Sequence, residues 1–92
     1  MHTMFHVDFR NQGEGGSLGF ARLEVELPFA TSMDIEFAHP VWHDGRKPAA
    51  IAYILDDDLF YVTFPQDDLP NAAARPQHAE MYTLHGWTVT LA

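Results

Sequence analysis

The sequence contains no cysteine. This absence excludes disulfide bonds, thiolate metal sites and cysteine-based catalysis. Small secreted domains often depend on disulfides because their hydrophobic cores are small. The composition therefore favours a reducing compartment, and we predict a cytoplasmic protein.

Long apolar runs are missing as well. The longest, Ala49–Leu55, falls far short of the ~18 residues that a membrane-spanning helix needs. Met1–Arg10 alternates polar and apolar residues and has no continuous apolar segment of the kind found in signal peptides. We therefore expect no membrane partner.

Positive charge is scarce, because 13 acidic residues face five Lys and Arg and leave a formal net charge of −8. Such a surface repels nucleic acid, so we expect no direct nucleic-acid binding. A basic protein is the partner that this charge would suit. An acidic inhibitor or DNA mimic, whose carboxylates stand in for phosphates, is therefore one alternative function.

The chain is long enough for one domain but not for two. With 92 residues, of which 47% are hydrophobic, it can bury a single core. We therefore predict one domain over residues 1–92.

Two segments with a two-residue periodicity, Thr3–Arg10 and Phe20–Phe29, predict a β-hairpin joined by the glycine-rich turn 11–19. One face of each segment is apolar and the other polar. Cross-strand pairs of opposite charge contribute roughly 0.2–1 kcal/mol, which helps to choose a register. The register favoured on both faces pairs Phe9 with Ala21, Val7 with Leu23, Phe5 with Val25, Asp8 with Arg22, and His6 with Glu24.

A second hairpin is expected over residues 49–64, with Asp56–Asp58 as its loop. This loop pairs Leu55 with Leu59, Tyr53 with Tyr61, and Ile51 with Thr63. Both faces of the hairpin are then apolar, which an antiparallel hairpin with one wet face would not show. Either two layers enclose the hairpin, or another subunit covers a face made of Ile54, Phe60, Val62 and Phe64.

The remaining segments predict further strands. Ser32–Ala38 alternates like a strand, and Val41-Trp42 resumes one beyond Pro40. Ala79–Leu84 and Trp87–Ala92 form either a third hairpin or one bulged strand, and the region near 68–75 forms at most one helical turn. The predicted fold class is therefore all-β: a small antiparallel barrel or sandwich of six to seven strands built from hairpins.

Six histidines in a short chain raise the possibility of a metal site. His6 and Asp8 share one strand face, and Glu24 lies across from them in the predicted register. Imidazole with carboxylates suits zinc, manganese or iron. His39 and His43 are a second candidate pair. A solvated face of paired charges, with Arg22 beside Glu24, is the simpler explanation of His6 and Asp8, and no pattern in the sequence specifies a cofactor.

No motif names a reaction, and the sequence identifies no catalytic residue. The strongest functional signal is the apolar, two-faced hairpin. The sequence therefore favours a non-enzymatic binding module that self-associates, as a homo-oligomer, through residues 49–64. A metal-dependent small barrel and an acidic inhibitor or DNA mimic are the alternatives.

Overall fold

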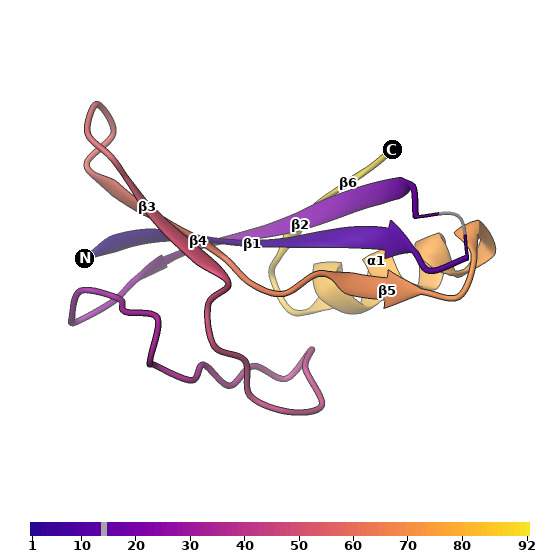
Figure 1. The fold of residues 1–92 in the computed structure, drawn as a ribbon, viewed down its shortest axis with the longest axis horizontal. Coiled ribbons are helices and arrows are strands. Elements are labelled where there is room, and N and C mark those ends of the chain that lie inside the picture. Colours follow the sequence, from indigo (N-terminus) through magenta and orange to yellow (C-terminus); the bar gives the residue numbers. More distant parts are fainter. Residues whose placement is uncertain (14) are drawn as a thin grey trace.

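The computed structural model describes residues 1–13 and 15–92, so Glu14 of the glycine-rich loop lies outside the described residues. Six strands and one short helical region make up the regular structure (Figure 1). The strands are β1 (His2–Asn11), β2 (Ser17–Glu26), β3 (Ala50–Ile54), β4 (Leu59–Thr63), β5 (Asp67–Leu69) and β6 (Thr88–Leu91). The helices are η1 (Ala72–Ala74) and α1 (Arg75–Leu84).

The strands form one mixed sheet in the order β3-β4-β1-β2-β6. The central strand is β1, whose alternating apolar residues Phe5, Val7 and Phe9 are all buried. On the side away from β2, β1 pairs with two strands that both run parallel to it. β4 pairs with the first half of β1, and β5 pairs with its last residues. Pro65, which has no N–H to donate, lies between these two strands and separates them.

The predicted class, mostly strands with a short helical region, is confirmed. Among the described residues, however, the sheet does not close into a barrel, and two of its pairings are parallel. The parallel pairings arise because the long connection 27–49 carries the chain across one face of the sheet. It delivers the β3–β4 hairpin to the far side of β1 (Figure 1).

The β1–β2 hairpin forms with the predicted faces but in a register shifted by two residues. Phe5 lies opposite Leu23, and His6 lies opposite Arg22 instead of Glu24. The shift arises because β2 begins earlier than predicted, at Ser17, and a bulge between Phe9 and Arg10 absorbs the extra residue. A shift of two leaves every side chain on its original face, since the side-chain period of a strand is two.

The predicted strand over Ser32–Ala38 is wrong. This stretch is irregular, and its one ladder contact is an isolated bridge between Phe37 and Arg46. Both edges of β1 are already occupied, so the segment lies across the face of the sheet instead. Phe37 packs edge-on against Phe5, at 5.1 Å between ring centroids. The predicted edge strand at Val41-Trp42 is also wrong, because these two buried residues lie in and next to a turn.

The predicted strand over Ala79–Leu84 is a helix. The predicted helical turn near 68–75 does form, as η1, and α1 continues it to Leu84. Pro76 lies in the first turn of α1, where its fixed φ and missing N–H do no harm. Gly86, with φ +88°, follows the helix. Among the described residues, no helix is long and apolar enough to cross a membrane.

The hydrophobic core lies between one face of the sheet and the layer formed by α1 and the connection 27–49. Trp42 of the connection and Tyr82 of α1 meet there, joined by a hydrogen bond from Trp42 Nε1 to Tyr82 Oη at 3.0 Å. Buried aromatic rings dominate this core: Phe5, Phe9, Trp42, Phe64, Tyr82 and Trp87.

Candidate functional site

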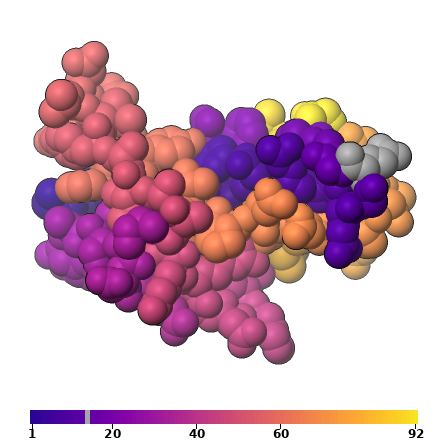
Figure 2. All heavy atoms as spheres, viewed as in Figure 1, coloured from indigo at the N-terminus to yellow at the C-terminus, as the bar shows by residue number. Residues whose placement is uncertain are grey.

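The β3–β4 hairpin projects from the end of the molecule that carries the N-terminus (Figure 1). In the space-filling view its tip forms a separate lobe (Figure 2). Within the described residues, β3 pairs with β4 on one side and forms an edge of the sheet on the other. The tip of the hairpin therefore stands clear of the core, which lies beneath β1.

The register of this hairpin differs by one residue from the prediction. Ile54 pairs with Leu59 and Tyr53 with Phe60, so the loop has four residues, Leu55 to Asp58. Asp58 adopts the left-handed conformation, with φ +48°, which Asp tolerates better than most residues. Its N–H donates to Leu55 O at 3.3 Å and closes the loop.

The four residues predicted to form an interface do not share a face. Val62 and Phe64 are 0% and 1% exposed. They belong to the core of the chain itself and expose almost no surface to a partner. Ile54 pairs with Leu59 and points to the face opposite Phe60, because the one-residue slip exchanges the faces of β3. Phe60 is half-buried against Tyr53, with 5.0 Å between ring centroids.

A different apolar surface is present at the tip of the hairpin. It consists of three consecutive residues, Tyr53, Ile54 and Leu55, which are 43%, 37% and 81% exposed. Tyr53 and Ile54 lie on opposite faces of β3, so this surface wraps around the end of the hairpin. Leu55 is exposed because it lies in the four-residue loop and does not pair with a residue of β4. We call these three residues the tip patch.

Carboxylates surround the tip patch, because Asp56, Asp57 and Asp58 follow it directly and are all exposed. The Tyr53 hydroxyl donates to the Asp58 carboxylate. This hydrogen bond, together with the nearby negative charge, raises the pKa of Tyr53 above its usual value. The tip therefore combines apolar side chains with a solvated acidic turn.

The predicted metal triad of His6, Asp8 and Glu24 is not assembled. His6 Nε2 and Asp8 Oδ1 are 2.8 Å apart, as their shared face predicts. Glu24, however, contacts His2. The guanidinium of Arg22 takes its place and donates to His6 Nδ1 at 3.2 Å. A cation beside the imidazole opposes metal binding there, and the two-residue register shift is the cause.

His39 and His43 do not form a metal site either. His39 packs against Trp87, whose Nε1 lies 3.3 Å from His39 Nε2. Burial, and then the nearby His85, lower the pKa of His39. His43 lies in an exposed bend. Throughout residues 1–13 and 15–92, no group of three His, Cys, Asp or Glu side chains could hold a metal ion.

A buried polar cluster centred on Asp67 was not predicted from the sequence. His78 Nε2 donates to Asp67 Oδ2 at 2.8 Å, and the Tyr82 hydroxyl donates to the same oxygen at 2.6 Å. Arg46 Nη1 lies 2.6 Å from Asp67 Oδ1, as an ion pair that is not aligned as a hydrogen bond. The cluster joins β5, α1 and the connection 27–49.

The charge state of this cluster follows from its contacts. Burial alone would raise the pKa of Asp67, but the hydrogen bonds from His78 and Tyr82 and the charge of Arg46 outweigh burial and lower it. Burial and the neighbouring carboxylate raise the pKa of Tyr82. Asp67 is therefore a carboxylate with two hydrogen-bond donors on Oδ2 and the charge of Arg46 beside Oδ1.

One sequence signal could have revealed this cluster. His78 and Tyr82 are four residues apart, the spacing that places two side chains on one helix face. Interpreting Ala79–Leu84 as a strand concealed that spacing. Asp67 gave no comparable signal, because its partner Arg46 comes from a distant, irregular segment.

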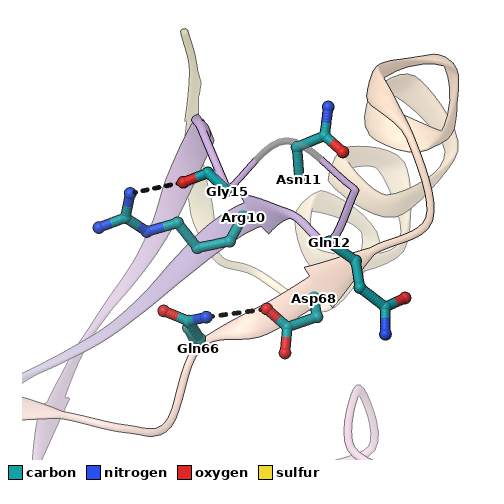
Figure 3. A pocket seen from close by; sticks show the side chains of 6 residues that line it. All are labelled: Arg10, Asn11, Gln12, Gly15, Gln66 and Asp68. Atoms are coloured by element: carbon teal, nitrogen blue, oxygen red, sulfur yellow. Dashed lines mark hydrogen bonds between the residues drawn. The ribbon is translucent and has the colours of Figure 1, made fainter.

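Two surface depressions lie near these residues. One, of about 430 Å³, borders His78 and is otherwise lined mainly by apolar side chains of η1, α1 and the segment before them. The other, of about 400 Å³, is polar and open (Figure 3). In it Arg10 donates to Gly15 O at 3.4 Å, and Gln66 donates to Asp68 at 2.8 Å. With one cation and one carboxylate, the polar depression selects neither anions nor cations.

No family model matches the chain, and comparisons with curated proteins and with solved structures gave no match either. The functional conclusion therefore depends on the residues of this chain. Of the features above, the projecting hairpin with its tip patch is the one that leaves large apolar side chains exposed.

Proposed function

We propose that the protein is a non-enzymatic binding module that assembles with itself through the hairpin of residues 49–64. The observation that carries this proposal is the tip patch, because three adjacent apolar side chains stand exposed on a projecting hairpin. Single exposed apolar residues are common on protein surfaces, whereas a contiguous group on a protrusion is typical of a binding site.

The size of the patch indicates the strength of such an assembly. Burying an exposed Leu, Ile or aromatic side chain contributes roughly 1.5–3 kcal/mol, and less when it is already half-buried. Six such side chains from two copies give a gain on the order of 10 kcal/mol, against an association cost of about 4–15 kcal/mol. At the low end of that cost the net gain is about 6 kcal/mol, which corresponds to a dissociation constant of tens of micromolar, so the balance fits a weak, reversible homo-oligomer.

Charge and composition complete the proposal. The formal net charge of −8 disfavours nucleic acid as a direct partner and leaves a basic protein as the second class of partner. The absence of cysteine is the observation that favours a cytoplasmic location. No cofactor is part of this function, because self-association requires none.

The proposal is tested by sedimentation velocity over a range of concentrations, with two matched variants. Leu55→Gln removes the most exposed apolar side chain of the tip patch. Leu84→Gln makes the same change at the end of α1, where Leu84 is 76% exposed. We expect Leu55→Gln to raise the dissociation constant at least about tenfold, and Leu84→Gln to leave it unchanged.

Two results would contradict the proposal. The first is a monomeric mass of the unmodified protein up to millimolar concentration. The second is an equal loss of association in both variants, because it would show that exposed leucines associate without regard to their position in the fold.

A further inference from the structure

The outer edge of β3 has a defined set of free backbone groups, which the structure allows us to identify. The N–H of Phe64 donates to His6 O of β1 at 2.9 Å. Neighbouring residues of a strand direct their backbone groups to opposite sides. Because Phe64 directs its groups to β1, Tyr61 and Thr63 direct theirs to β3.

The partners of these two residues on β3 are Ala52 and Ala50. Ala52 therefore uses its N–H and C=O groups within the sheet, and at the start of the strand Thr63 O accepts from Ala49 N–H at 2.7 Å. By the same alternation, the N–H and C=O groups of Ile51 and Tyr53 point away from β4, toward the open edge. An open edge of this kind is a template for pairing with another strand.

β3 lacks the features by which edge strands normally resist such pairing. Residues Ala50–Ile54 include no charge and no proline, and no bulge interrupts their pairing with β4. Pro48 and Asp56 flank the strand and limit any ladder to this short stretch. The edge is therefore open over five residues and closed beyond them.

We propose that two copies of the chain pair their β3 edges antiparallel, about a two-fold axis at Ala52. This inference rests on the proposed self-association and specifies its geometry. In this register Ile51 of one copy lies opposite Tyr53 of the other, and both have their backbone groups directed outward. The two residues exchange hydrogen bonds on either side of the axis, and Ala52 forms the non-hydrogen-bonded pair at its centre.

The charges next to β3 favour the antiparallel direction. Beyond the strand the chain turns back at Leu55–Asp58, so the acidic turn of each copy lies toward the end of the other copy's β3 that follows exposed Lys47. The two acidic turns then lie on opposite sides of the axis, roughly 20 Å apart, because each begins three residues from Ala52 at ~3.3 Å per residue. A parallel or tip-to-tip arrangement would bring six aspartates together in a chain that already carries a net charge of −8.

Two-fold pairing also limits the size of the assembly. The same edge is used by both copies, so a dimer leaves no β3 edge free. The result is one continuous sheet across two chains.

Single-cysteine variants test this geometry without interference, because the chain has no cysteine of its own. In Ala52→Cys the two thiols meet at the axis, where antiparallel non-hydrogen-bonded Cα atoms are ~4.5 Å apart and within disulfide range. Asp57→Cys is the matched control, because residue 57 is also exposed but lies far from its counterpart across the axis. Under mild oxidation, we expect Ala52→Cys to form a linked dimer at least about tenfold faster than Asp57→Cys.

A charge exchange provides a second measurement. Lys47→Glu and Asp57→Lys should each weaken the dimer about two- to tenfold. The double variant should recover most of that loss, and the recovery should diminish at high salt.

The outcomes separate this inference from the proposed function. Faster cross-linking of Asp57→Cys, or equal rates for both variants, would overturn the antiparallel pairing. Absence of cross-linking in both variants, with a dimeric mass of the unmodified protein, would overturn edge pairing but leave self-association intact. The same absence with a monomeric mass would overturn both.

Discussion

The side chain of Tyr82 connects three separate segments of the chain through buried hydrogen bonds. Its hydroxyl accepts a hydrogen bond from Trp42 and donates one to Asp67, so it joins the connection 27–49 to α1 and β5. Both contacts are buried, where an unpaired donor costs far more than it does at the surface. The long connection therefore has a fixed position although it has almost no regular structure of its own.

Replacing Tyr82 by Phe should show this cost. The change leaves the Trp42 N–H without an acceptor and Asp67 with one donor fewer, so we expect the free energy of unfolding to fall by about 1–3 kcal/mol. Tyr53→Phe is the matched control, because that hydroxyl is exposed, and its effect should stay within about 0.5 kcal/mol. Urea unfolding followed by tryptophan fluorescence measures both. Equal effects would contradict the role assigned to Tyr82.

Contacts between side chains on one strand could be predicted from the sequence, whereas contacts across strands could not. His6 and Asp8 lie together as predicted, because strand periodicity alone places them on one face. The predicted contact with Glu24 failed because it depended on the register of β2. The sequence does not specify this register well. Charged residues alternate along β2, and a shift of two residues keeps every side chain on the same face of the sheet.

Among the elements, the strands with a strict polar–apolar alternation were predicted well. β1 and β2 have one buried face each, and the alternation follows directly from that. The segment Ser32–Ala38 alternates too, but both edges of β1 are occupied and it forms no strand. The alternation of Tyr82 and Leu84 suggested a strand in what is a helix, because in a short helix one buried residue gives too little periodicity.

Gly19 shows how one residue controls the attachment of an element. It has φ +132°, and a Cβ atom there would lie 2.3 Å from Thr90 O and 2.9 Å from Leu91 Cα, both on β6. Only glycine allows β2 and β6 to approach this closely. Gly19 was predicted to lie in the turn 11–19, so its contact with β6 was not expected.

We predict that Gly19→Ala separates β6 from β2 and lowers the free energy of unfolding by more than about 2 kcal/mol. Gly16→Ala is the control, because nothing lies within 4 Å of its added Cβ. Its stability should be unchanged or raised by up to about 1 kcal/mol. Denaturant midpoints of the two variants test the prediction, and equal stabilities would refute it.

At the scale of the whole molecule, the order of the strands in the sheet could not be predicted from the sequence. Strand order depends on where the connection 27–49 crosses, and that path is fixed by Trp42, Arg46 and their distant partners. The exposed hairpin was predicted in outline from its two apolar faces. The residues left exposed were not, because a one-residue change in loop length exchanged the faces of β3.

The central claim is that the free edge of β3 is an assembly surface, and amide hydrogen exchange of its residues tests this most directly. Ala52 should be protected at every concentration, because its N–H is paired with β4. The amides of Ile51 and Tyr53 should exchange rapidly in dilute protein and become protected as concentration rises. If Ile51 and Tyr53 exchange at the same fast rate from micromolar to millimolar protein, the edge is not paired and the claim is wrong.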